Sequence, residues 1–232
     1  MAKMQNLLEK AILHELSEKF GFEEAKMYWA ILHNKNLDKY NRSRKYRIFE
    51  NLFNCGLLLK VKEGKLFEYM PTPPTFISLF LETGTKLIEE KEKVYFERYN
   101  FFFKAKKIFM ELTGEVVDGM MLFLVKYFMK KNAYIIMGGP PIYLILKQRI
   151  KRFKDIKFIG VKEYFKNEKV EDNIILLPQE IIGDRRLCLI DDSILMALFK
   201  TVDNIYVGYL TTNKDKIKEK LSEIKNLSSL RQ

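Results

Sequence analysis

The chain has 232 residues and a formal net charge of +11, because 41 Lys and Arg residues outnumber 30 Asp and Glu residues. Hydrophobic residues make up 47% of the sequence, which is enough for packed cores and excludes a wholly disordered chain. No apolar run reaches the ~20 residues of a membrane span, and the first residues lack the apolar segment of a secretion signal. Two cysteines cannot form a disulfide framework. We therefore expect a cytoplasmic protein that makes no contact with membranes.

Residues 1–74 are predicted to form helices followed by a β-hairpin. Apolar residues at helical spacing predict a first helix over residues 3–20 and a second over residues 23–33. A third helix is predicted over residues 42–55, where a glycine follows it as a typical C-terminal signal. Two short apolar runs within residues 57–70 flank a Glu-Gly turn and predict the hairpin.

Residues 75–114 are predicted to form a long helical linker. Pairs of apolar residues recur every seven residues along this segment, which is typical of a coiled-coil-like seam. The same pattern also fits a helix that packs against its own chain, and both interpretations stay open at this point. The seam interpretation predicts a homodimer with contacts from Leu87, Val94, Tyr95, Phe101, Phe102, Ile108 and Phe109.

Residues 115–232 alternate between strand and helix patterns, which predicts an α/β domain. The apolar run Tyr134–Met137, a helix over residues 142–153 and a second apolar run over residues 157–161 form a βαβ pattern, which predicts two parallel strands. A closing helix is expected over residues 214–227. Further strands are expected at residues 173–177, 186–190, 194–199 and 205–209. The whole chain is therefore predicted to be an α+β protein.

Cations gather at the start of the third predicted helix. Five of the nine residues from Lys39 to Arg47 are Lys or Arg, and the nearest acidic residue, Asp38, precedes them. An exposed basic helix start followed by a basic hairpin fits contact with DNA phosphates, whereas the alternative is a solvated face of a Lys-rich protein. The predicted DNA contacts are Lys39, Arg42, Ser43, Arg44, Lys45, Arg47, Lys60, Lys62 and Lys65.

The order helix, helix, basic helix and hairpin is that of a winged helix. Phe20–Tyr28 resembles the start of the winged-helix domain in archaeal TrmB-like transcriptional regulators. Arg42–Leu52, continued by Gly56-Leu57, resembles the recognition helix of that family, and Glu68–Pro74 resembles the exit from its wing. The resemblance implies a DNA-binding regulator with a winged-helix domain over residues 1–74.

In that family a coiled-coil linker and a sensor domain related in fold to phospholipase D follow the winged helix. Residues 135–140 resemble the first strand of this sensor domain, and residues 189–193 resemble a later strand and turn. The resemblance therefore implies a helical linker over residues 75–114, a phospholipase D-like domain over residues 115–232 and a small-molecule effector. Phospholipase D chemistry uses paired His-x-Lys motifs, but this sequence has no histidine after His33. We therefore expect a protein that is not an enzyme and that needs no metal or cofactor.

The sequence departs from the family in the segment before the basic helix. Only eight residues, Asn34 to Asn41, separate the second predicted helix from Arg42, where the family has a full helix and turn. At ~1.5 Å per helical residue, eight residues cannot supply both. Two hypotheses follow. The chain is either a dimeric, non-catalytic transcriptional regulator that still binds DNA, or a protein-interaction module derived from such a regulator.

Overall fold

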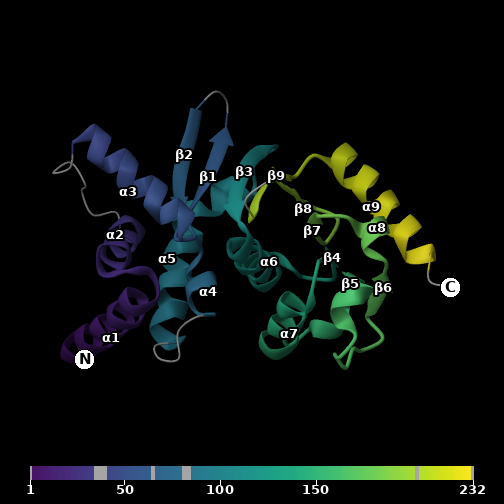
Figure 1. Cartoon of the computed structure of the whole chain (residues 1–232), viewed down its shortest axis with the longest axis horizontal. Coiled ribbons are helices and arrows are strands. Elements are labelled where there is room, and N and C mark those ends of the chain that lie inside the picture. The colour runs from purple at the N-terminus through teal and green to yellow at the C-terminus, as the bar shows by residue number, and fades with distance from the viewer. Residues whose placement is uncertain (1, 34–40, 64–65, 80–84, 202–203, 231–232) are drawn as a thin grey trace. The chain divides into compact units, whose positions relative to one another are not determined.

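The computed structural model describes residues 2–33, 41–63, 66–79, 85–201 and 204–230, which form a mixed α+β protein (Figure 1). The chain divides into two compact units, which differ from the predicted segments 1–74, 75–114 and 115–232. Unit 1 consists of Met1–Asn100 and Leu112–Met120, whereas unit 2 consists of Phe101–Glu111 and Met121–Gln232. The chain therefore enters unit 2 after Asn100 and returns to unit 1 at Leu112 before it completes unit 2.

Unit 1 begins with three helices and a hairpin, as the sequence predicts. The helices are α1 (Ala2–Phe20), α2 (Phe22–Leu32) and α3 (Arg42–Asn54). The hairpin pairs β1 (Leu58–Glu63) with β2 (Leu66–Pro71) in antiparallel register, and the short helix α4 (Pro74–Ile77) follows. Gly21 adopts φ 95°, a left-handed conformation that glycine tolerates and that allows the sharp bend between α1 and α2.

The core of unit 1 joins all three helices. Ile12, Tyr28 and Phe53 are buried on α1, α2 and α3, respectively. The Tyr28 hydroxyl donates a hydrogen bond to the backbone oxygen of Thr72 (3.0 Å), which connects α2 to the end of the hairpin. The burial of Phe53 in this core anchors α3 within unit 1.

The predicted helical linker is only partly correct. The helix α5 (Thr85–Phe103) ends early, and Ile108–Thr113 form the strand β3. Tyr95, Phe102 and Ile108 are buried within their own chain, whereas Val94 and Phe109 are 46% and 48% exposed. The side chains of Leu87 and Phe101 lie outside the described residues. The five described dimer contacts therefore do not share one exposed helical face, and the predicted seam is wrong as a continuous heptad pattern.

Unit 2 is built on a mixed sheet. Its strands follow the order β3-β9-β8-β7-β4-β5-β6. The strands β4–β5 and β5–β6 pair in parallel, which confirms the predicted βαβ unit, whereas β4–β7, β7–β8 and β8–β9 pair in antiparallel fashion. The strand bounds after β3 are Ala133–Ile136 (β4), Ile156–Val161 (β5), Ile174–Leu177 (β6), Arg185–Ile190 (β7), Ile194–Lys200 (β8) and Ile205–Thr211 (β9).

Helices connect and cover these strands. They are α6 (Gly114–Phe128), α7 (Pro140–Arg149), α8 (Gln179–Ile182) and α9 (Lys214–Ser229), with 3-10 turns at Phe153–Asp155 and Lys162–Phe165. None of the helices in the described part of the chain combines the length and apolar character that a membrane crossing requires.

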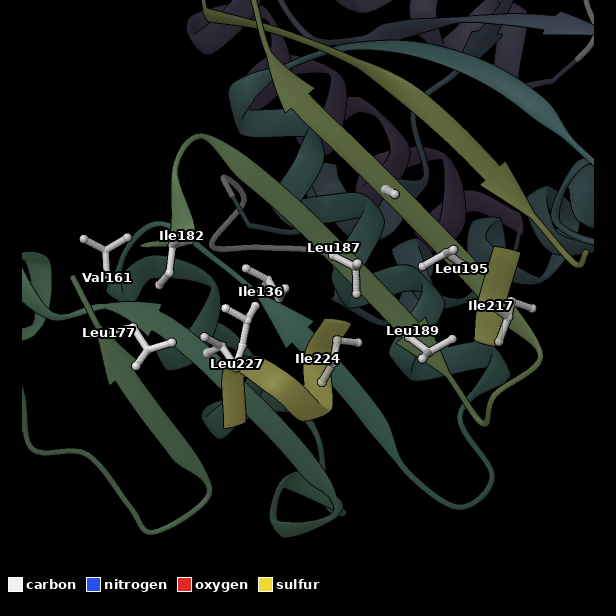
Figure 2. Close-up of a cluster of buried hydrophobic side chains, with 12 residues drawn as sticks. Ile136, Val161, Leu177, Ile182, Leu187, Leu189, Leu195, Ile217, Ile224 and Leu227 are labelled. Carbon is white, nitrogen blue, oxygen red and sulfur yellow. The ribbon is translucent and has the colours of Figure 1, made fainter. Parts of the chain in front are cut away.

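The core of unit 2 lies between α9 and the sheet. Ile217, Ile224 and Leu227 project from α9 into a buried apolar cluster, as Figure 2 shows. Leu187 and Leu189 of β7 contribute to the same cluster. Because buried apolar area stabilises a fold by about 25 cal/mol per Å², this layer holds α9 on one face of the sheet.

Candidate nucleic-acid interface

The basic helix start predicted from the sequence is formed by the first turns of α3. Asn41 precedes the helix in an extended conformation, and its side-chain oxygen accepts a hydrogen bond from the backbone N–H of Arg44 (2.8 Å). This is the N-cap arrangement that Asn favours. Arg42, Ser43 and Arg44 are all exposed. The cap therefore fixes the helix start while the cations remain accessible to solvent.

The helix α3 has a different character at its two ends. Arg47 is exposed on the first half of the helix, where Lys45 is half-buried. Leu52 and Phe53 on the second half are buried in the core of unit 1. The C-terminal half therefore anchors the helix, and the N-terminal half presents positive charge to solvent. An anion at this end would also meet the positive end of the helix dipole.

Side chains from the hairpin hold it against α3. The Tyr69 hydroxyl on β2 donates a hydrogen bond to Oε1 of Glu50, and the Tyr69 ring lies 5.3 Å from the Phe49 ring. Lys60 on β1 places its ammonium 3.3 Å from Oε2 of Glu50 and 4.2 Å from the centre of the Phe53 ring. Glu50 thus joins both strands of the hairpin to one helix.

These contacts determine the charge state of the junction. Partial burial alone would raise the pKa of Glu50, but hydrogen bonds from Tyr69, Tyr46 and Lys60, together with the charge of Lys60, hold this pKa below its usual value. Burial and the neighbouring Glu50 carboxylate raise the pKa of Tyr69 well above its usual value. Near neutral pH the junction therefore holds an ionised Glu50 and a neutral Tyr69.

The structure separates the predicted DNA contacts into groups. Five of them share the exposed half of α3, namely Arg42, Ser43, Arg44, Lys45 and Arg47. Lys60 lies instead at the Glu50 junction, so we assign it to holding the hairpin rather than to meeting a phosphate. Lys62 is half-exposed, with its ammonium 5.1 Å from the centre of the Phe67 ring. Lys39 and Lys65 lie outside the described residues.

Three contributors to this site were missed in the sequence. The role of Asn41 could have been predicted, because an Asn directly before a helical pattern is a recognised N-cap signal. The pairing of Glu50 with Tyr69 could not have been predicted, because these residues are 19 positions apart and meet only when the hairpin folds back on α3.

No protein-family model matches the sequence, and no curated protein matches it. Among solved structures, one similar chain is that of TrmBL2, described as an archaeal chromatin protein whose structure shows a novel mode of DNA binding. The match covers 94% of this chain and 96% of that chain, with 14% sequence identity and a TM-score of 0.39. This degree of similarity does not place the chain in a family. We therefore argue function from the residues of α3 and the hairpin.

Proposed function

We propose that the chain is a cytoplasmic, TrmB-like transcriptional regulator that binds double-stranded DNA through a winged-helix domain in unit 1. The observation that carries the proposal is the division of α3 into a buried anchor and an exposed cationic half bearing Arg42, Arg44 and Arg47. The hairpin β1–β2 serves as the wing. Unit 2 is the phospholipase D-like sensor domain in this proposal, and a small-molecule effector is its ligand.

The chemistry of these side chains suits a duplex. An α-helix fits the major groove, where an Arg guanidinium can donate two hydrogen bonds to a guanine or contact a phosphate. Lys62 on the wing would contact the sugar–phosphate backbone, which orients a protein on DNA without reading its sequence. Each phosphate contact makes the affinity more sensitive to salt.

Replacing Arg44 and Arg47 by Ala tests the proposal. We expect weaker binding of a fluorescent random duplex, and a plot of log affinity against log salt concentration should flatten by roughly 0.9 for each lost phosphate contact. Fluorescence anisotropy between about 50 and 200 mM salt measures both quantities. The matched control is Lys214→Ala with Lys218→Ala, which removes the same charge from exposed positions on α9. Equal affinities and slopes for the two variants would contradict the role of α3.

The proposal also includes a homodimer. Its contact surface is smaller than the sequence predicted. Of the predicted contacts on α5, Val94 is 46% exposed, whereas Tyr95 is fully buried in its own chain. A Val94→Asp substitution should therefore weaken a dimer without disturbing the core. Light scattering of the wild-type protein should give twice 27.6 kDa. A monomer mass for the wild type would refute the dimer.

A second candidate function rests on the spacing of the helices. Only nine residues separate the end of α2 at Leu32 from the start of α3 at Arg42, which is short for the additional helix that helix-turn-helix proteins place before the recognition helix. A regulator-derived module that binds another protein would tolerate this shortening. Nuclease treatment before affinity purification separates the two functions. A stoichiometric protein partner that survives the nuclease favours the module, whereas recovery of DNA alone favours the regulator.

A further inference from the structure

One stretch of unit 2 carries a larger net positive charge than α3 does. Between Lys126 and Lys157 the sequence has nine Lys and Arg residues but a single acidic residue, Asp155. These 32 residues therefore hold a net charge of +8, compared with +11 for the whole chain. The cations are spread over the end of α6, the turn before β4, the helix α7 and the turn before β5. Their spacing in the sequence gives no sign of a common surface.

The sheet brings two of these turns together. The strands β4 and β5 are parallel, with Ala133 opposite Ile156, so the turns that precede them lie at the same edge of the sheet. Arg152 in the second turn donates hydrogen bonds to the backbone oxygens of Lys130 and Lys131 in the first turn. Five exposed lysines therefore gather around this edge, and we name them the basic edge: Lys130, Lys131, Lys151, Lys154 and Lys157.

Two acidic residues at this edge are part of its support. Asp191 lies in the tight turn between β7 and β8 at φ 49°, and its carboxylate accepts hydrogen bonds from three consecutive backbone N–H groups. Their donors are Lys130, Lys131 and Asn132, at 2.7, 2.8 and 2.8 Å. Asp155 pairs with Arg152 at 2.6 Å. Both carboxylates thus position the turns, while the five lysines remain exposed.

The positive surface continues into an open cavity beside β5. Lys154 and Lys157 line this cavity together with Lys225 from α9. Asn173 lies at its wall and donates hydrogen bonds to the backbone oxygens of Phe153 and Ile156, which keeps the second turn in place. Glu171 and Asp172 also line the cavity, and Glu171 pairs with Lys147 at 2.9 Å. Three lysines and two carboxylates therefore line this hollow, with lysines in excess.

We propose that the basic edge is a second DNA-binding surface, which holds the sugar–phosphate backbone of a duplex independently of α3. Lysines on separate turns present positive point charges that suit the regular array of phosphates. Their flexible side chains lack the planar arrangement of donors with which Arg contacts bases. Amphipathic helices that bind membrane surfaces insert large apolar side chains. In the described part of residues 126–157, no large apolar side chain is exposed. The surface therefore fits DNA better than it fits an anionic membrane.

Four variants test this inference. The edge variant replaces Lys130, Lys131, Lys151 and Lys154 by Ala, and the control variant makes the same change at Lys166, Lys169, Lys214 and Lys218, which are exposed elsewhere in unit 2. The third is Arg44→Ala with Arg47→Ala, and the fourth combines these with the edge substitutions. Each is checked by circular dichroism and then titrated with the random duplex. Raising the salt from about 50 to 200 mM weakens binding. Each lost phosphate contact should make this weakening roughly 3.5-fold smaller.

We expect the edge variant to bind the duplex more weakly than the control variant, and the combined variant to lose the binding that remains after the α3 substitutions. An edge variant that binds like the control variant would overturn the inference. Binding to vesicles with anionic lipids is measured alongside. The inference would also be overturned if the edge substitutions weakened binding to these vesicles but not to the duplex. The proposal for α3 fails separately, if the Arg44 and Arg47 substitutions change nothing while the edge substitutions abolish binding.

A footprint on the wild-type protein gives a second test that does not depend on the folding of a variant. Lysine acetylation followed by mass spectrometry should show that the duplex protects Lys130, Lys131, Lys151 and Lys154. Lys166 and Lys169 should react equally with and without DNA. Equal reactivity of all these lysines in bound and free protein would contradict the inference.

Discussion

The two basic surfaces of this protein carry similar charges on different supports. On α3 the cations are neighbours in the sequence, most of them are Arg, and one rigid helix fixes their spacing. On the basic edge they are lysines from two turns, which are held together by Arg152 and Asp191. The planar Arg guanidinium on a helix suits the reading of base edges in a groove, whereas flexible Lys side chains on turns present point charges that suit phosphates. In our proposals, α3 supplies the specificity and the basic edge adds affinity that depends on salt but not on sequence.

The basic edge depends more on a single residue, Asp191, than α3 depends on its cap. We therefore expect the largest loss of stability from a substitution of Asp191. Replacing it by Ala removes the acceptor of three backbone N–H groups and places Ala at a positive φ, so we expect a loss of about 2–3 kcal/mol in the free energy of unfolding of unit 2. Urea denaturation followed by circular dichroism measures the loss.

The neighbouring Asp192 provides the matched control, because it adopts a similar φ of 51°. An Asp192→Ala substitution should cost only the backbone strain, which is about 1 kcal/mol. Asp191→Asn should fall between the two, because Asn tolerates this backbone conformation but carries no charge. Equal losses for Asp191→Ala and Asp192→Ala would show that the three hydrogen bonds do not support the edge.

The second effect concerns the support of α3. Asn41→Ala removes the cap on the Arg44 backbone N–H and should cost about 1 kcal/mol, whereas Asn41→Ser should retain most of the stability. Trp29 is the single tryptophan of the chain and is buried in unit 1, so its fluorescence follows the unfolding of that unit. An unchanged urea midpoint for Asn41→Ala would contradict the capping role.

The smallest effect tests the junction between α3 and the hairpin. The folded state lowers the pKa of Glu50 below its ordinary value of 4.5, so its carboxylate stabilises the fold at neutral pH, and this contribution disappears as the pH falls through the folded-state pKa. Because the Glu50–Lys60 pair is partly exposed, we expect Glu50→Gln to cost less than about 1 kcal/mol at pH 7.

The stabilities of wild type and Glu50→Gln should converge as the pH falls through the folded-state pKa of Glu50, because the carboxylate then becomes protonated. Trp29 fluorescence in urea, measured at a series of pH values below 7, makes the comparison. A difference that persists unchanged at the lowest pH would show that packing, rather than charge, explains the effect of the substitution.

Local sequence patterns predicted the elements whose contacts are local. The helix α3, the hairpin and the βαβ unit follow from periodicity and turn residues, and all three are present. The heptad pattern failed at Ile108 and Phe109, because alternating apolar residues in β3 coincide with a seven-residue repeat. Ile108 and Met110 point into the core while Phe109 is exposed, which is the period of a strand.

Contacts between distant segments account for what the sequence did not predict. The basic edge depends on the parallel pairing of β4 with β5, which places Lys130 and Lys151 at one edge although 20 intervening residues separate them. The role of Lys60 likewise depends on Glu50, which lies on the preceding helix. Residue types alone cannot show that Lys130 and Lys151 share an edge or that Lys60 pairs with Glu50, because lysines are common over the whole surface of this chain.

The path of the chain limits how this architecture can change by recombination. Phe101–Glu111 belong to unit 2, yet the next nine residues, Leu112–Met120, belong to unit 1, where Gly119 lies against Phe76. A gene fragment that ends at residue 100 would lack part of unit 1, and one that starts at residue 121 would lack the strand β3 of unit 2. Single-crossover exchange therefore cannot transfer either half intact, so the two halves are expected to be inherited together rather than shuffled as independent modules.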